Sequence, residues 1–317
     1  MENKNEKVIV IIGPTAVGKT KLSIELAKRF NGEVISGDSM QIYKGMDIGT
    51  AKIKQEEMEG IPHHLLDIKS PEESYSVAEF QSMVRPLITD ITNRGKMPMI
   101  VGGTGLYIQS VLYDYKFTDS KGNEQLRSEL EKKAAIMGKE ALYEELVQID
   151  PVSAKKIHPN NVRRVIRALE IYYDCGKTMS EVEHTNEANP LYDVALIGLT
   201  MDREQLYKRI NYRVDLMVEE GLLEEVKGLY KTGLRDCQSI QAIGYKEIYS
   251  YLDGVQSLDS AIEQLKQNSR RYAKRQLTWF RNKMNVEWFD MTPPLSMDEK
   301  VEEIFQYIAG KFSGKEN

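Results

Sequence analysis

The sequence carries a phosphate-binding loop close to its N-terminus, and this motif constrains the fold more than any other feature. Residues 13–20 fit the pattern G-x-x-x-x-G-K-[ST] and directly follow an apolar run, residues 8–12, of strand length. In such a loop the glycines let backbone N–H groups turn inward, the lysine reaches the outer phosphates, and the hydroxyl is a ligand for Mg²⁺. An ordinary glycine-rich turn is the alternative. We predict a strand, loop and helix that hold a diphosphate or triphosphate through Gly13, Pro14, Thr15, Ala16, Val17, Gly18, Lys19 and Thr20, with Thr20 as the metal ligand.

The best second buried strand argues against ordinary hydrolysis of ATP or GTP. Nucleoside triphosphatases usually carry an acidic residue for the metal at the end of a second apolar strand. Here the run at residues 97–101 ends in Gly102-Gly103-Thr104-Gly105, which contains no acid. These glycines either form a functional turn or a plain tight turn. Because the phosphate loop suits any pyrophosphate group, the ligand need not be a nucleotide.

An acidic residue is available at a different strand end. The short apolar run at residues 34–36 leads into Gly37-Asp38-Ser39, which places Asp38 at the carboxyl end of a strand. In open α/β sheets this edge is where ligands bind. Asp38 is therefore a candidate site residue, and a turn or helix-cap role is the alternative.

The order of the predicted elements is that of an α/β protein with a P-loop core, a mainly parallel sheet and an inserted all-helical domain. Helices are predicted at residues 19–29 and 76–92, and strands resume at 194–199 and 286–289. Between residues 118 and 189 the pattern changes to helix after helix. We therefore expect a core domain at residues 1–117 and 190–317, which includes a C-terminal basic helix, and a helical domain at 118–189.

Composition excludes several other classes of protein. Of 317 residues 41% are hydrophobic, enough for a substantial core. The two cysteines, Cys175 and Cys237, form no C-x-x-C pattern and suggest neither a disulfide framework nor a zinc site, so we expect buried or unreactive thiols. Adjacent His63 and His64 would point to opposite sides of a strand, which disfavours a shared metal. The apolar run before Gly13 is too short for a signal peptide or a membrane span, so we expect a cytoplasmic protein without membrane contact.

Basic residues are concentrated in one predicted helix, although the net charge is −5. No acidic residue occurs between Gln264 and Val286, and at helical spacing a basic stripe lies beside an apolar face. The stretch contains seven basic residues: Lys266, Arg270, Arg271, Lys274, Arg275, Arg281 and Lys283. A phosphate backbone is bound through such residues. A solvated charged face is the alternative, and the smaller cluster of Arg163, Arg164 and Arg167 would by itself more often form ordinary ion pairs.

Several motifs in sequence order resemble the bacterial tRNA dimethylallyltransferase family, also called tRNA isopentenylpyrophosphate transferases. The resemblance covers about residues 8–290, and the second of the following segments is much more specific than the first. The segments are GPTAVGKT (13–20), GDSMQIYKGMDIGTAK (37–52), VGGTGLY (101–107), RALE (167–170), RVDLMVEEGL (213–222), IGYKE (243–247) and RQLTWFR (275–281).

The resemblance implies the reaction and the catalytic residues. The family transfers a dimethylallyl group from dimethylallyl diphosphate to N6 of adenosine 37, beside the tRNA anticodon, so the P-loop would hold an isoprenoid diphosphate together with Mg²⁺. Asp38 would be the general base for the adenine amine, and Thr104 would orient the donor or the amine. Lys19 and Arg213 would stabilise the departing diphosphate. For Arg213, an ion pair on the helix surface with Asp215 is the alternative.

The resemblance also implies the tRNA contacts. The target base must leave the stacked anticodon loop, so the arginines and the helical insertion would hold the flanking RNA. We expect a monomer. The predicted tRNA-binding residues are Asp38, Ser39, Met40, Gln41, Thr104, Arg127, Arg163, Arg164, Val165, Ile166 and Arg167, with Arg270 and Lys274 added from the basic helix.

Three other functions are compatible with parts of the sequence. A small-molecule P-loop kinase would share the loop and the acid but has no use for the basic helix. An RNA-binding nucleotide switch would need a base-recognition motif, which we do not find. An adenylate isopentenyltransferase acting on free AMP is the nearest alternative, but a free nucleotide does not require the helical insertion.

Overall fold

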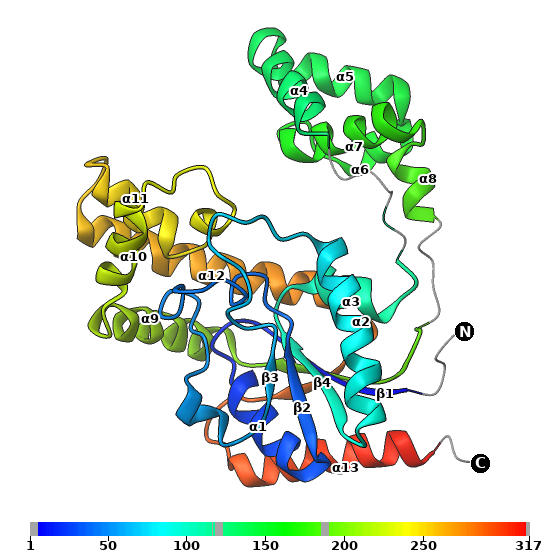
Figure 1. The fold of residues 1–317 in the computed structure, drawn as a ribbon, viewed down its shortest axis with the longest axis vertical. Helices are drawn as coiled ribbons and strands as arrows, with labels where there is room; N and C mark the ends of the chain where they lie inside the picture. The colour runs from blue at the N-terminus through cyan, green and yellow to red at the C-terminus, as the bar shows by residue number, and fades with distance from the viewer. Residues whose placement is uncertain (1–5, 116, 118–122, 185–189, 315–317) are drawn as a thin grey trace. The chain divides into compact units, whose positions relative to one another are not determined.

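A computed structural model describes residues 6–115, 117, 123–184 and 190–314, and it divides the chain into two compact units (Figure 1). The first unit comprises Met1–Leu112 and Leu191–Asn317, and the second comprises Tyr113–Pro190. The second unit contains the residues 118–189 at which the sequence predicts a helical domain.

The first unit is built on a six-stranded parallel sheet with the order β3-β2-β4-β1-β5-β6. Parallel neighbours need crossover connections, which here are mostly helical. The α/β fold with a P-loop core that the sequence predicts is confirmed. The strands are β1 (Lys7–Ile12), β2 (Gly32–Ser36), β3 (His63–His64), β4 (Met97–Gly102), β5 (Asp193–Thr200) and β6 (Glu287–Asp290).

The predicted strands are present at nearly the predicted positions, and β3 is the strand that the sequence pattern did not indicate. It has two residues, too few for any periodicity, and it exists because Val34 and Ile35 pair with it. The histidines of β3 have separate partners. His63 Nδ1 lies 2.9 Å from the carbonyl oxygen of Ile61, and His64 Nε2 lies 2.8 Å from a carboxylate oxygen of Glu33.

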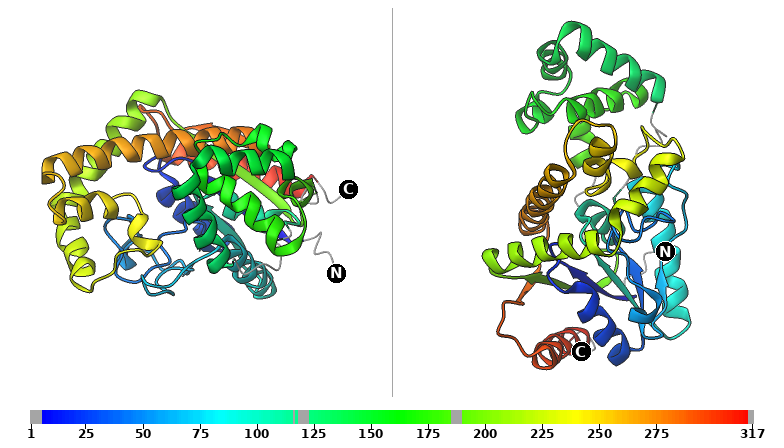
Figure 2. Two further views of the ribbon diagram at one scale, coloured as in Figure 1. Left: turned by 90° about the horizontal axis from the view of Figure 1, so that it is seen from above. Right: turned by 90° about the vertical axis from the view of Figure 1, so that its left-hand side faces the viewer.

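Helices cover the sheet and extend beyond one end of it. The segment after β1 forms α1 (Lys19–Phe30), and the segment before β4 forms α2 (Val77–Asn93), as predicted. Figure 2 shows the long helix α12 beside α9 and α11, and contacts join α12 to both. The remaining helices of this unit are α3 (Gly105–Leu112), α9 (Arg203–Glu219), α10 (Leu222–Lys231), α11 (Tyr245–Leu252), α12 (Leu258–Lys283), α13 (Met297–Ser313) and the short 3₁₀ helices at Gln55–Met58 and Ser239–Gln241.

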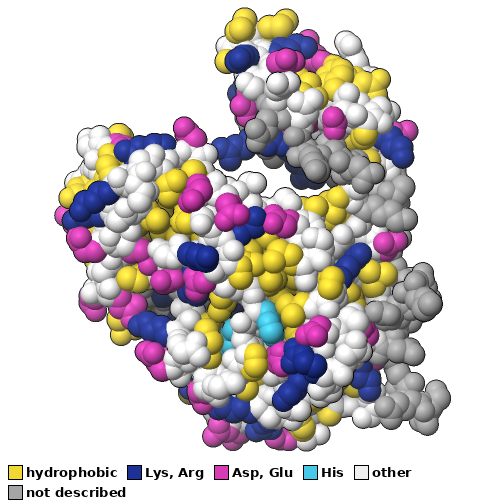
Figure 3. Space-filling view, in the orientation of Figure 1, with side chains coloured by type: hydrophobic (Ala, Val, Ile, Leu, Met, Phe, Trp, Pro, Cys, Tyr) yellow, Lys and Arg dark blue, Asp and Glu magenta, His cyan; other side chains and the backbone are white. Residues whose placement is uncertain are grey.

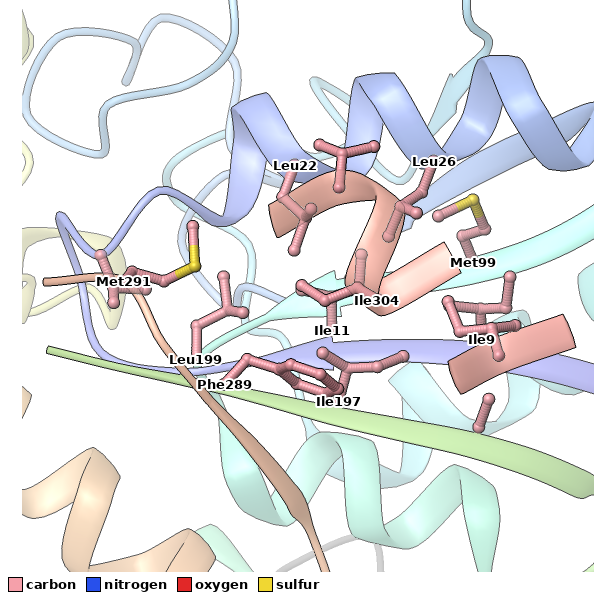
Figure 4. Close-up of a cluster of buried hydrophobic side chains, with 14 of the residues drawn as sticks. Ile9, Ile11, Leu22, Leu26, Met99, Ile197, Leu199, Phe289, Met291 and Ile304 are labelled. Atoms are coloured by element: carbon pink, nitrogen blue, oxygen red, sulfur yellow. The ribbon is translucent and has the colours of Figure 1, made fainter. Parts of the chain in front are cut away.

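One face of the sheet packs against α1 and α13 (Figure 4). Alternate residues of a strand point to opposite faces, so Ile9 and Ile11 of β1 join this cluster. Leu22 and Leu26 of α1 and Ile304 of α13 complete its centre. This packing holds the start of α1, and with it the P-loop, at the carboxyl end of β1.

The regular elements among the described residues of the second unit are helices, and one isolated bridge joins Tyr113 to Pro190. Its helices are α4 (Glu124–Met137), α5 (Lys139–Ile149), α6 (Pro151–Lys156), α7 (Val162–Cys175) and α8 (Met179–His184). They enclose a core of their own, formed by Leu130, Leu142, Leu146, Ala154, Ile157, Val165, Ile166, Ala168 and Leu169.

Two smaller findings concern the composition. Cys175 is exposed and Cys237 is half-buried, so neither thiol belongs to the core. Within the part of the chain that the structure describes, no helix is long and apolar enough to cross a bilayer.

Candidate active site

The P-loop lies between β1 and α1, and two of its glycines are required by the backbone. Gly13 has a φ of 151° and passes so close to β5 that a Cβ atom would lie 2.7 Å from the carbonyl oxygen of Leu199. Gly18 has a φ of 110° and starts α1. Both conformations disfavour a residue with a side chain. The two glycines therefore allow the loop backbone to turn directly into the N-terminus of α1.

Lys19 is held within this loop. Its Nζ donates hydrogen bonds to the carbonyl oxygens of Gly13 at 3.0 Å and Pro14 at 2.8 Å. The pKa of Lys19 is lowered to about 8, chiefly by burial and to a smaller extent by the nearby Arg213, while the carboxylate of Asp38 acts in the opposite direction. Burial disfavours the charged form of Lys19 in the free protein, and an anion bound at the loop would stabilise that charged form.

The loop opens into a cavity of about 840 Å³. The predicted site residues Lys19, Asp38 and Arg213 all line it. They come from α1, from the turn after β2 and from α9, so the fold brings together residues that are far apart in sequence. Other lining residues include Thr15, Ala16, Gly18, Thr20, Ser39, Met40, Gln41, Gly102, Gly103, Arg209, Tyr272 and Gln276.

Asp38 follows the end of β2 and stabilises the turn in which it lies. Its Oδ1 accepts a hydrogen bond from the backbone N–H of Met40 at 2.8 Å. The turn role that the sequence left open is therefore present, and it coexists with a position on the cavity wall. Thr104 supports the same turn, because its Oγ1 accepts a hydrogen bond from the N–H of Ser39 at 3.3 Å, while Gly102 and Gly103 form the wall beside it.

Gln41 connects this turn to the loop at residues 47–51. Its Nε2 donates to the carbonyl oxygens of Thr50 at 3.3 Å and Ala51 at 3.4 Å. The carbonyl oxygen of Ala51 also accepts from Nη2 of Arg213 at 3.4 Å. Ala51 has a φ of 49°, in the left-handed region that residues with a Cβ seldom adopt. The carbonyl oxygen of Ala51 therefore accepts hydrogen bonds from two predicted site residues, Gln41 and Arg213.

Glu225 of α10 binds the backbone of the loop at residues 47–51, and no sequence pattern indicated this residue. The carboxylate of Glu225 accepts hydrogen bonds from the backbone N–H groups of Asp47, Ile48 and Gly49 at 2.8 to 3.1 Å. It also accepts one from the hydroxyl of Tyr245 at 2.6 Å. Glu225 therefore connects the motif at residues 37–52 with the motif at residues 243–247.

Arg213 faces the cavity and has no ion pair with Asp215. Lys266 of α12 takes that partner instead, with 2.7 Å between its Nζ and Oδ1 of Asp215. The alternative prediction of an ion pair between Arg213 and Asp215 on the surface of α9 is therefore wrong. Helix α12 packs beside α9, and its Lys266 is the cation that pairs with Asp215. Burial lowers the pKa of Arg213 below its ordinary value, although Asp38 opposes this effect. Arg209 lies four residues before Arg213 and reaches the same cavity, a spacing that could have revealed it.

The predicted basic stripe on α12 is divided between paired and exposed residues. Lys266 is paired with Asp215 and Glu263, and Arg270 donates to Oδ1 of Asn211. Lys274 is exposed, as are Arg271, Arg275 and Arg281. On the face shown in Figure 3, dark blue basic and magenta acidic side chains are interspersed. The face of α12 beside the stripe is apolar as predicted, with Leu265, Ala273 and Phe280 buried.

The predicted tRNA-binding residues of the helical unit fall into three groups. Arg163 and Arg164 are exposed at the start of α7. Arg127 and Arg167 pair with the fully buried carboxylate of Glu170, at 2.9 and 3.0 Å. Val165 and Ile166 are 1% and 4% exposed and belong to the core of the unit. Their side chains cannot be the tRNA contacts that we expected, because the helix turns them inward.

The fold and the cavity together define a class of protein. The P-loop follows β1, and the turn that contains Asp38 follows β2 of the same parallel sheet. Both line a cavity at the carboxyl ends of the strands. The molecule is a P-loop α/β protein.

The chain belongs to the IPP transferase family, whose model matches residues 41–283. It is 67% identical to the tRNA dimethylallyltransferase of Anoxybacillus flavithermus, over 98% of this chain and 99% of that protein. The family that the sequence motifs resemble is therefore confirmed.

Solved structures agree with this assignment. The full-length tRNA isopentenylpyrophosphate transferase of Bacillus halodurans is similar with a TM-score of 0.75 and 58% identity, and the match covers 98% of each chain. A eukaryotic dimethylallyltransferase acting on tRNA has a TM-score of 0.84 and 36% identity, over 99% of this chain and 81% of that one.

Proposed function

We propose that this protein transfers a dimethylallyl group from dimethylallyl diphosphate to N6 of adenosine 37, next to the tRNA anticodon, and releases diphosphate. One observation carries the proposal: the P-loop and the turn at Asp38 line the same cavity. One wall therefore suits a diphosphate and the other suits a group that must lose a proton. Relatives named as this enzyme, which match nearly the whole chain, supply the identity of the substrates.

The leaving group is the part of the substrate that gains negative charge as the allylic C–O bond breaks. Donors placed at that position stabilise the transition state more than the ground state. Lys19 in the P-loop and Arg213 of α9 both line the cavity, and the carboxylate of Asp38 raises the pKa of each. We assign both to the diphosphate.

The residues present are compatible with Mg²⁺. Thr20 contributes a hydroxyl at the start of α1, in the cavity beside the P-loop. Among the described residues no cluster of three or more His, Cys, Asp or Glu side chains could hold a metal by itself. This arrangement suits an ion that keeps several waters and is bound mainly through substrate phosphates. Bound there, the ion would neutralise charge on the diphosphate.

Asp38 is proposed to accept the proton of the adenine amine. An exocyclic amine is a weak nucleophile because its lone pair is delocalised into the ring, so a nearby base assists the attack. The new bond forms between N6 and the allylic carbon, the C–O bond to diphosphate breaks, and the proton of N6 passes to the carboxylate. Ser39, Met40 and Gln41 follow Asp38 on the cavity wall and are proposed to contact the base.

RNA binding is proposed for two exposed basic surfaces. Arg163 and Arg164 provide one on the helical unit, and Lys274 provides one on α12. Each would contact phosphates that flank the extruded base. Arg127 and Arg167 already share the buried carboxylate of Glu170, so we assign them to the stability of the unit in addition to any contact with RNA.

The decisive experiment offers the protein labelled dimethylallyl diphosphate and Mg²⁺ with either bulk tRNA or AMP. We expect label in tRNA, competition by inorganic pyrophosphate, and none in AMP. Label in AMP alone would favour an adenylate isopentenyltransferase. ATP hydrolysis or phosphorylation of a small acceptor without prenyl transfer would favour a P-loop kinase, and either result would contradict the proposal.

A further inference from the structure

Gln276 of α12 is a buried polar residue that the proposed mechanism does not use. Its side chain is 5% exposed and lies on the face of the helix that packs inward. The backbone N–H of Thr15 donates to its Oε1 at 3.0 Å, and its Nε2 donates to the carbonyl oxygen of Gly103 at 3.1 Å. One amide therefore joins the P-loop to the turn after β4.

The fit around this amide is close. A Cβ atom on Gly103 would lie 2.0 Å from Nε2 of Gln276, so a side chain there would displace the amide from its present position. Both polar ends of the amide are used, which is what a buried amide requires. Asparagine is shorter by one methylene and could not reach both partners. The length and the two-ended chemistry of glutamine thus match the gap between the loop and the turn.

The hydrogen bond to Thr15 acts on the backbone of the phosphate-binding loop itself. Thr15 lies between Pro14, whose carbonyl oxygen accepts from Lys19, and the residues that enter α1. Orienting the peptide group of Thr15 restricts the neighbouring N–H groups, which form the anion cradle. A cradle that is ordered before the ligand arrives loses less entropy on binding.

We propose that Gln276 is a positioning residue that holds the P-loop in its phosphate-binding shape by tying the Thr15 amide to the Gly103 carbonyl. This role rests on the proposed function, because it presumes that the loop binds a diphosphate. The competing explanation is that Gln276 only packs α12 against the core, in which case its loss would reduce stability without affecting anion binding.

The test measures the binding of inorganic pyrophosphate with Mg²⁺ by calorimetry, together with thermal unfolding. Gln276→Leu removes both hydrogen bonds at similar volume, and we expect affinity to fall about tenfold or more, as for a buried group left without its partner. Gln267→Leu is the matched control, because Gln267 is exposed on the same helix. It should bind pyrophosphate like the wild type.

A second variant separates positioning from packing through its pH dependence. Gln276→Glu is nearly isosteric, and its protonated carboxyl group can accept from Thr15 and donate to Gly103, whereas the carboxylate cannot donate. Relative to wild type at the same pH, its affinity for pyrophosphate should be weak at pH 8 and recover by several-fold at pH 6, because burial raises the pKa of a carboxyl group. The Gln276→Leu variant should show no recovery.

The outcomes are distinct. Pyrophosphate binding by Gln276→Leu within twofold of wild type, with only a lower melting temperature, would overturn the positioning role and leave the proposed function intact. An affinity ratio for Gln276→Glu that does not change between pH 8 and pH 6 would also overturn it, even if the leucine variant did not fold. Failure of the wild-type protein to bind pyrophosphate would contradict the proposed function and this role together.

Discussion

Asp38 combines a structural contact with a proposed chemical role, and a conservative substitution separates them. Asp38→Asn keeps the Oδ1 acceptor for the N–H of Met40 and loses the base. We expect the single-turnover rate with saturating tRNA and donor to fall by about 10² to 10⁴, while both substrates still bind.

Asp202→Asn is the matched control for Asp38. Oδ1 of Asp202 accepts from the backbone N–H groups of Glu204 and Gln205 and caps α9, and Asp202 is not among the residues that line the cavity. Asparagine caps a helix about as well as aspartate, so this variant should keep its rate. A loss smaller than about tenfold in Asp38→Asn would rule out the general base.

The titration of Lys19 predicts a pH dependence of diphosphate binding. The pKa of Lys19 is lowered to about 8 in the free site, chiefly by burial. A bound anion favours the charged form and raises this pKa, so binding takes up a proton when the pH is near or above 8. Affinity for pyrophosphate should therefore fall as pH rises through about 8. Calorimetry in buffers of different ionisation enthalpy measures the proton uptake directly.

Lys19→Arg provides the comparison for this titration. A guanidinium stays protonated across the range, so proton uptake near pH 8 should disappear in the variant even if its affinity is lower. Equal uptake in both proteins would assign the titration to another group and contradict this origin.

At the scale of single elements, the basic residues of α12 differ in how readily they can contact a phosphate of tRNA. Lys274 is exposed, whereas Lys266 is paired with Asp215 and Glu263. If Lys274 contacts a phosphate, Lys274→Ala should reduce the slope of log affinity for tRNA against log salt by about one unit. Pyrophosphate affinity should not change. Filter binding at a series of salt concentrations measures the slope.

Two lysines calibrate this result. Lys311 is exposed on α13, so Lys311→Ala should leave the slope unchanged. Lys266→Ala should reduce it by less than Lys274→Ala, because the charge of Lys266 is already compensated. Arg270, which donates to Asn211, should also contribute less than its position in the stripe suggested. An unaltered slope in Lys274→Ala would leave α12 as an ordinary charged surface.

At the scale of the whole molecule, the two compact units have separate cores, so damage to one should remain local. Glu170→Ala removes the buried carboxylate that Arg127 and Arg167 share. Both arginines are partly exposed and can regain water, so we expect a loss of about 1–3 kcal/mol rather than the full cost of a buried unpaired charge. Hydrogen exchange should accelerate in α7 and not in α1.

Pyrophosphate binding tests the same independence. The P-loop lies in the first unit, so Glu170→Ala should bind pyrophosphate like the wild type. Faster exchange in α1, or weaker pyrophosphate binding, would show that the two units are energetically coupled.

Local patterns in the sequence determined much of this protein. The P-loop, the four longer inner strands and the helical insertion were predictable, because each depends on residues that are neighbours in the chain. The acidic turn at Asp38 was also predictable, since a strand end followed by Gly-Asp places a carboxylate at the ligand-binding edge. Helical periodicity identified the apolar face of α12.

Only the tertiary structure decided which side chains meet across long separations. Gln276 lies on the buried face of α12, yet it bonds to Thr15, which lies 261 positions earlier in the chain. Asp215 pairs with Lys266 of α12 and not with Arg213 of its own helix. Glu225 accepts hydrogen bonds from the backbone of the loop at residues 47–51. A sequence pattern reports the direction of a side chain on its own helix or strand. The partner it meets depends on how the elements pack, because distance and desolvation in the folded state set the strength of every polar contact.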